Sequence, residues 1–312
     1  MVTNPFDDDR FVEIQDVGPR DGLQNEAVEV TTADKIRFVN GCVEAGITRI
    51  EVASFVNPKR VPRMADGDAV IAGLPPADGV IYSGLVLNEK GLERAKGKAI
   101  QEIGVVAVSS DGFGIANQKQ TSAESVEMVC RVINGAHEAG LRTVAVISTA
   151  FGCPYEGVVP QSRVIEIVRR LADAQPTEIT LADTIGAAVP TQVRDLVGAA
   201  QEVAPRMPLR CHFHNTRNTG LANIYAALEV GVRRFDSSLG GIGGCPFAPK
   251  ATGNVATEDV VHMVEACGYR TGLDLAKLIE HSHWLDGVLG RPTPALVSKA
   301  GIFPPADTAR GG

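Results

Sequence analysis

This sequence has few cysteines, no basic cluster and no long apolar run, and each shortage argues against a class of protein. Its six cysteines lack the regular spacings of a disulfide framework, so we expect reduced thiols in an intracellular chain. Lysine and arginine number 30 against 37 acids and do not cluster, which argues against a nucleic-acid partner. No apolar run reaches the roughly 18 residues of a membrane span, so we expect no membrane partner.

Both ends of the chain are predicted to lie outside the main domain. Residues 1–10 form an acidic extension that lacks the basic start and apolar run of a secretory signal, so we expect a cytoplasmic protein. Residues 291–312 are proline-rich, and we expect the last dozen of them to form a poorly ordered tail. No linker interrupts residues 11–290, which are predicted to form a single domain.

Short apolar runs alternate with helical patterns throughout this domain. Thr31-x-x-Asp34 and Thr121-x-x-Glu124 resemble capping boxes that begin helices. Glycines 46, 140 and 231 each end a helical pattern just before an apolar run, as a left-handed terminating residue does. The predicted strands are residues 12–16, 49–54, 81–86, 102–108, 142–148, 178–183, 209–214 and 234–239.

This recurring helix-to-strand joint predicts an α/β fold with parallel strands. Eight such strands fit a closed (β/α)8 TIM barrel in one domain. The alternative is a doubly wound open sheet, but the first strand is not followed by the glycine-rich fingerprint of a dinucleotide-binding unit. A barrel carries its chemistry at the C-terminal ends of its strands. Polar residues gather at or near those ends: Asp16, Arg20, Asp21, Glu51, Ser54, Asp183, Thr184, His212, His214, Asp236, Ser237 and Ser238.

His212 and His214 are the strongest candidates for metal ligands. Residues two apart in a strand point to the same face, so the two imidazoles lie side by side. Asp21, after the first strand, is a candidate third ligand, and Asn254 offers a carbonyl oxygen. Two nitrogens with two or three oxygens suit Mg or Mn better than structural zinc. The alternatives are two packed histidines and an ordinary turn aspartate before Gly22.

Three further residues are candidates for catalysis. Arg20 adjoins Asp21 and is suited to stabilising an enolate, unless it makes only a surface salt bridge. Glu51 lies in an apolar strand and needs a partner there, as support for the site or as a structural ion pair. Cys245 lies in the glycine-rich loop 240–247, whose composition predicts mobility, and is either a proton donor or an inert thiol.

Together these segments resemble the 3-hydroxy-3-methylglutaryl-CoA lyase family of metal-dependent carbon–carbon lyases. The resemblance runs from about residue 12 to residue 289. It is carried by VGPRDGLQNE (17–26), IEVASFVNPK (50–59), GCPYEG (152–157), DTIG (183–186), HFH (212–214), GGCPFA (243–248) and GNVATED (253–259).

The resemblance implies a site and a reaction. It implies metal ligation by Asp21, His212, His214 and Asn254, with Arg20 as the enolate-stabilising group. It further implies Glu51 and Asp183 as supporting acids and Cys245 on a mobile lid. The implied reaction is a retro-Claisen cleavage of an acyl-CoA thioester to acetyl-CoA and acetoacetate, in which Asp21 or a metal-linked water takes the hydroxyl proton. Similar lyases are commonly dimers, so a homodimer is the expectation by analogy.

Some positions depart from the family pattern. Ala27 stands where a lysine is usual, and Asn215 stands where aspartate is common. Residues 110–117 keep Phe113 and Asn117 but lack the usual glutamate and lysines. A lyase for citramalyl-CoA or for a longer 3-hydroxy-3-alkylglutaryl-CoA is therefore an alternative.

Two further alternatives differ in class. A Claisen-type synthase would usually need a longer chain, and Pro19 favours the lyases. A non-catalytic barrel would bind metal without turnover, but every implied catalytic position is filled.

Overall fold

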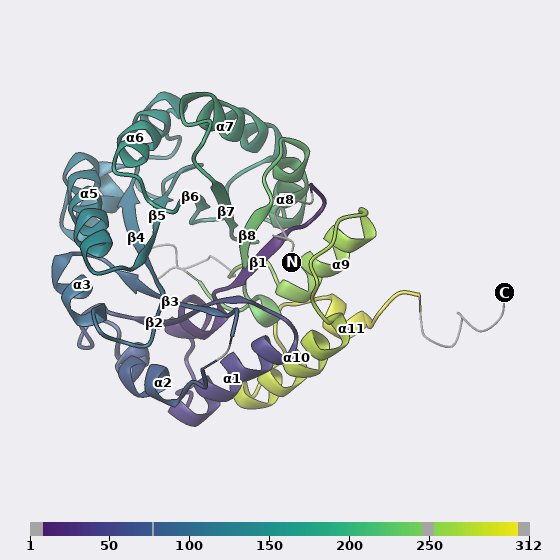
Figure 1. Ribbon diagram of the computed structural model, residues 1–312. Coiled ribbons are helices and arrows are strands. Elements are labelled where there is room, and N and C mark those ends of the chain that lie inside the picture. The colour runs from purple at the N-terminus through teal and green to yellow at the C-terminus, as the bar shows by residue number, and fades with distance from the viewer. Residues whose placement is uncertain (1–8, 77, 245–252, 305–312) are drawn as a thin grey trace.

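The computed structural model describes residues 9–76, 78–244 and 253–304, and its core is a closed parallel barrel (Figure 1). The strands follow one another around the barrel in sequence order, and β1 pairs with β8 to close it. This pairing excludes the open sheet and confirms the predicted (β/α)8 architecture. The strands are β1 (Glu13–Asp16), β2 (Arg49–Ser54), β3 (Ile81–Val86), β4 (Glu102–Val108), β5 (Arg142–Ser148), β6 (Glu178–Asp183), β7 (Leu209–Phe213) and β8 (Arg234–Ser237).

Helices surround the barrel, and α10 packs on both α1 and α9 to complete the ring (Figure 1). Thr121 forms the full capping box with Glu124. The Thr31 hydroxyl accepts from the backbone N–H of Asp34 and donates to the Asp34 carboxylate. The helices are α1 (Thr32–Glu44), α2 (Gly67–Gly73), α3 (Glu89–Ala95), α4 (Asp111–Gln118), α5 (Ser122–Glu138), α6 (Gln161–Asp173), α7 (Pro190–Val203), α8 (Gly220–Glu229), α9 (Thr257–Ala266), α10 (Leu275–Leu289) and α11 (Val297–Ala300). Short helical turns are η2 (Gly18–Gly22), η3 (Pro62–Met64) and η4 (Leu239–Gly241).

The barrel is apolar outside and charged at the bottom of its interior. Outward-facing strand residues pack against apolar helix faces, such as Val129 and Ile133 of α5, which are fully buried. Inside, Arg49 lies 2.6 Å from Glu102 and 2.9 Å from Glu178, and Arg210 donates to Glu178 at 2.6 Å. We call this network the ionic floor; its members are Glu13, Arg49, Glu102, Glu178 and Arg210.

Two buried acids hold the loops above the barrel. Asp16, at the end of β1, accepts hydrogen bonds from the backbone N–H of Leu239 at 2.8 Å and from the Thr257 hydroxyl at 2.7 Å. Glu258 accepts from the backbone N–H of Gly240 at 3.0 Å. The described start of the glycine-rich loop is therefore buried and hydrogen-bonded, while the rest of the predicted lid lies outside the described residues.

The segment after α10 continues the packed structure. The backbone N–H groups of Leu296 and Val297 donate to Asp259, and Arg291 pairs with Glu26 at 2.6 Å. Residues 291–300, which the sequence assigns to the tail, thus belong with the barrel, and most of the predicted poorly ordered tail lies outside the described residues. Among the described helices, none is long and apolar enough to cross a membrane.

Candidate active site

The loop after β1 is a tight π-helical turn rather than an irregular loop. The backbone N–H of Asp21 donates to the carbonyl of Val17 at 2.7 Å, and those of Arg20 and Gly22 reach the same oxygen. Gly18 is required there, because a Cβ would lie 2.8 Å from both Asp16 Oδ1 and the Phe38 ring. Single π turns of this kind often occur at functional sites. Here the turn places Arg20 and Asp21 on the rim of the barrel interior.

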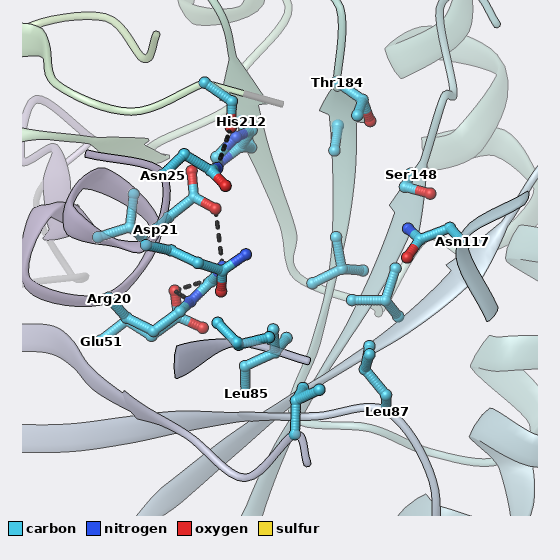
Figure 2. Close-up of a pocket in the computed structure, with 18 of the residues that line it drawn as sticks. Arg20, Asp21, Asn25, Glu51, Leu85, Leu87, Asn117, Ser148, Thr184 and His212 are labelled. Atoms are coloured by element: carbon cyan, nitrogen blue, oxygen red, sulfur yellow. Dashed lines mark hydrogen bonds and ion pairs between the residues drawn. The ribbon is translucent and has the colours of Figure 1, made fainter. Parts of the chain in front are cut away.

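Asp21, His212 and His214 converge at this rim, with one potential ligand atom of each lying within 4.8 Å of the others. The two histidines come from the end of β7 and project to the same side, with ring centroids 5.2 Å apart. Figure 2 shows Asp21 and His212 facing the same cavity. The predicted triad is thus assembled from opposite ends of the sequence because β1 and β7 both flank β8.

Asn254 is adjacent to this triad. It forms an isolated antiparallel bridge with His214, and its Nδ2 donates to Asp21 Oδ2 at 2.9 Å. Its Oδ1 is buried, as is Nδ1 of His214, and neither atom has a hydrogen-bond partner among the described residues. Buried polar atoms are rarely left unsatisfied, and a divalent cation would satisfy such acceptors. The residues present therefore fit the implied metal.

The charges of Asp21 and His214 suit cation binding. Burial alone would raise the pKa of Asp21, but Arg20 and the two imidazoles hold it below its usual value. Burial, aided by His212, lowers the pKa of His214 to about 4, so its imidazole is neutral. Burial opposes protonation of His212 as well, but the Asp236 carboxylate raises its pKa overall.

Arg20 and Glu51 form a close ion pair beside the triad. Glu51 Oε2 accepts from Arg20 Nε at 2.7 Å, and Asp21 Oδ1 accepts from Arg20 Nη1 at 2.7 Å. Burial raises the pKa of Glu51 to about 7, although Arg20 opposes the rise. The guanidinium is thereby held in place by two carboxylates, and Arg20 lines the cavity beside Asp21 and Glu51 (Figure 2).

The cavity has a volume of about 570 Å³ and two kinds of wall. Its charged side holds Arg20, Asp21 and Glu51, and across from them lie Asn117, Ser148 and Thr184 (Figure 2). Apolar residues from β3, from just after β3, and from β4 and β5 line the space between these two sides. Exposed cations also line the cavity. The apolar residues are Leu85, Leu87, Val106 and Val146, and the cations are Arg60 and Lys119.

Not every predicted site residue lies in this cavity. Asp183 is fully buried and accepts from the backbone N–H groups of Ala187 and Ala188 at 2.8 and 3.0 Å, so it orders the loop after β6. Cys245 lies outside the described residues. Of the departures from the family pattern, Asn215 accepts from the Gly220 backbone and does not line the cavity. Phe113 and Asn117, which match the pattern, do line it.

Sequence reasoning assigned no role to Asp236, which contacts His212 at 3.2 Å. It also gave no role to Gln15, which lines the cavity. The signal was present, because alternate residues of β8 and β1 are polar at Arg234 and Asp236, and at Glu13 and Gln15. In a barrel strand such alternation marks the inward face.

Comparisons with known proteins agree with this geometry. The family model described as HMGL-like matches residues 11–284. The (R)-citramalyl-CoA lyase of Chloroflexus aurantiacus is 44% identical over 94% of this chain and 96% of that protein. The hydroxymethylglutaryl-CoA lyase YngG of Bacillus subtilis is 42% identical over 91% of this chain and 95% of that protein.

A solved structure extends the likeness to three dimensions. The HMG-CoA lyase from Acinetobacter baumannii, in complex with coenzyme A and 3-methylmalate, matches with a TM-score of 0.90 and 40% identity. The match covers 95% of this chain and 97% of that one. With a family model matched over most of its length and lyases this similar along nearly the whole sequence, the chain belongs to the HMGL-like family of lyases.

Proposed function

We propose that this chain cleaves 3-hydroxy-3-methylglutaryl-CoA into acetyl-CoA and acetoacetate with the help of a divalent cation. The observation that carries the proposal is the convergence of Asp21, His212 and His214 beside the Arg20 guanidinium, in one cavity. Such a site offers a cation for one developing negative charge and a guanidinium for another. A retro-Claisen cleavage needs both, because charge moves from an alkoxide to an enolate.

Asp21, His212, His214 and Asn254 are the proposed ligands, and the mixed nitrogen and oxygen set favours Mg or Mn. Bound there, the cation would act as a Lewis acid toward the oxygens of the substrate. The neutral imidazole of His214 and the ionised carboxylate of Asp21 are already in the protonation states that ligation requires.

The remaining residues have distinct proposed tasks. Asp21 is the candidate base for the proton of the tertiary hydroxyl. The C2–C3 bond then breaks, C3 becomes the ketone of acetoacetate, and the electron pair moves onto the thioester as an enolate. Arg20, oriented by Glu51, stabilises the enolate oxygen. A proton delivered to C2 completes acetyl-CoA; Cys245 stays the proposed donor and Asp183 a supporting acid.

The cavity supports an acyl-CoA substrate. Its volume of about 570 Å³ suits the acyl group and the pantetheine arm, with the nucleotide outside. Arg60 and Lys119 are exposed cations in its lining, with no side-chain ion pair among the described residues, and are available to phosphate groups. A relative with 40% identity has been solved with coenzyme A bound.

Citramalyl-CoA is the second candidate substrate, because the relative at 44% identity is a citramalyl-CoA lyase. The two substrates differ in the group on C3, where a carboxylate replaces a carboxymethyl group. Cleavage of citramalyl-CoA would give pyruvate and acetyl-CoA. The mechanism and the metal site would be the same.

The deciding experiment measures acetyl-CoA, acetoacetate and pyruvate released from each thioester, with Mg or Mn and then with a chelator. Metal-dependent release of acetoacetate from the first thioester, with little pyruvate from the second, supports the main proposal. Preference for the second thioester keeps the site and changes the substrate. Activity that survives chelation contradicts metal dependence. A homodimer and a cytoplasmic location also stay proposals, which rest on analogy with similar lyases.

A further inference from the structure

The side chains inside the barrel form layers. Asp236 joins the ionic floor to the layer above it. In β7, Arg210 of the ionic floor is followed two positions later by His212. In β8, Asp236 pairs in register with His212 on one side and with Gln15 of β1 on the other. Neighbouring residues in register point to the same face of a sheet, so these side chains form one inward layer above the floor.

Asp236 uses its two carboxylate oxygens for different layers. Oδ2 lies 3.2 Å from Nδ1 of His212, and Oδ1 lies 3.2 Å from Nη1 of Arg210. Arg210 is itself fully buried and donates to Glu178 at 2.6 Å and to Glu13. The position of the carboxylate is therefore set from below by Arg210, whose side chain is buried.

We propose that Asp236 is a positioning residue that accepts a hydrogen bond from Nδ1 of His212 and so directs Nε2 of that imidazole toward the cation. The inference rests on the proposed metal site and adds a residue to its support. Carboxylates placed behind a ligand histidine select its tautomer and fix the plane of its ring. The ionic floor is thus connected to the site above it through the side chain of Asp236.

The second histidine is held differently. Nδ1 of His214 has no hydrogen-bond partner among the described residues, and the backbone of His214 is bridged to Asn254 instead. Replacing Asp236 should therefore weaken metal binding through His212 and leave the contribution of His214 to metal binding unchanged. This asymmetry makes the proposal testable by a double-mutant cycle.

The experiment measures Mn²⁺ affinity of the full chain without substrate, by electron paramagnetic resonance of the free ion. Asp236→Ala is expected to weaken binding roughly 10- to 100-fold in the wild-type background and also in His214→Ala. In the His212→Ala background the same change should have no further effect. An equal loss in the His212→Ala background would overturn the proposal.

Two controls separate positioning from damage to the fold. Glu102→Gln removes another buried carboxylate, which pairs with Arg49 and does not touch His212, and should leave Mn²⁺ affinity within about twofold of wild type. If Glu102→Gln lost as much Mn²⁺ affinity as Asp236→Ala, any substitution in the ionic floor would disturb the site. That result would reject a specific positioning role for Asp236. If Asp236→Ala does not fold, Asp236→Asn keeps the volume and takes its place in the cycle.

A spectroscopic readout is independent of affinity. In ¹⁵N spectra of the metal-free chain at alkaline pH, the His212 resonances are those that His212→Ala removes. They should report a proton on Nδ1, and Asp236→Asn should abolish the preference for this tautomer. A proton on Nε2 in the wild-type chain would contradict the proposal. Failure of the metal site itself has a different signature, since His212→Ala and His214→Ala would then leave Mn²⁺ binding unchanged.

Discussion

At the scale of single residues, Asp21 is the most connected group of the site. One oxygen accepts from Arg20, the other accepts from Asn254, and the carboxylate lies among the ligand atoms of two histidines. Arg20 in turn joins Asp21 to Glu51. The charges at the cavity wall therefore alternate in sign, which keeps the guanidinium in place at the cavity that Arg20 lines.

Replacing Arg20 tests its role in the chemical step. Arg20→Gln should lower kcat roughly 100-fold, since losing one preorganised donor costs about 3 kcal/mol of transition-state stabilisation. KM should change little, because the enolate charge develops only during reaction. Steady-state kinetics with the preferred thioester provides the measurement.

Arg60→Gln is the matched comparison, because Arg60 also lines the cavity but is an exposed cation that does not contact Asp21 or Glu51. It should raise KM for the CoA thioester and leave KM for the corresponding pantetheine thioester unchanged. An Arg20 effect confined to KM would refute the assignment of Arg20 to the enolate.

At the scale of elements, the η2 turn shows how closely the site depends on one local conformation. Its chain approaches the buried Phe38 ring and the Asp16 carboxylate, so position 18 has no space for a side chain. Asp16 also holds Leu239 and Thr257, which ties the loop after β1 to the loop after β8. The ligands on these two loops therefore depend on each other for their positions.

Gly18→Ala should destabilise the fold by about 1–3 kcal/mol, because its Cβ would overlap atoms that are buried and hydrogen-bonded. It should also reduce kcat by displacing Arg20 and Asp21. Gly198→Ala in α7 is the control, since a Cβ there meets nothing within 4 Å, and it should be neutral or stabilise by up to about 1 kcal/mol. Urea denaturation compares the two variants, and equal midpoints would show that the turn tolerates a side chain.

The sequence predicts the positions of the strands well, but it does not predict contacts that depend on how neighbouring strands are aligned. Strand positions agree closely because alternation and the terminating Gly46, Gly140 and Gly231, all with positive φ, are local signals. The grouping of Asp21 with the histidines followed from a general rule about barrel strands. The contact of Asp236 with Arg210 depends on which residues face one another across strands, and a single sequence does not contain that pairing.

At the scale of the whole molecule, the ionic floor takes the place of the apolar filling that most barrels have. Arg49 bridges Glu102, Glu178 and Glu13, and these residues come from strands spread around the barrel. Buried charges of this kind add little net stability, but they strongly oppose any arrangement in which one is left alone. We therefore expect the floor to favour the register in which all of these charges are paired.

Arg49→Met should accordingly lower the free energy of unfolding by about 3–5 kcal/mol, because Glu102 would lose its main buried partner. Arg131→Met removes an exposed partner of Glu89 and should leave the urea midpoint unchanged. Similar midpoints for the two variants would show that the floor does not hold the strands together.

Stability should also depend on pH through Glu258. Burial raises the pKa of Glu258 to about 7 from an ordinary value of 4.5, despite opposing hydrogen bonds from Ser282 and Gly240. Between these values the folded chain retains a proton that the unfolded chain has released, so the free energy of unfolding falls as pH rises through this window. The full contribution is at most about 3 kcal/mol.

Glu258→Gln has no proton to lose, so the difference in urea midpoint between wild type and variant should change from pH 4.5 to pH 8 in favour of the variant. Asp16, another buried acid, is present in both chains and cancels from this difference. A constant difference across that range would contradict the assignment to Glu258.

The proposed ligand set has a consequence for how the protein is made. Asp21 follows the first strand, the histidines end the seventh, and Asn254 comes after the eighth. A ribosome delivers the N-terminal strands first. If all four proposed ligands are needed, the cation site would be complete only in a chain that extends past residue 254. The proposed metal loading would then follow translation of nearly the entire barrel.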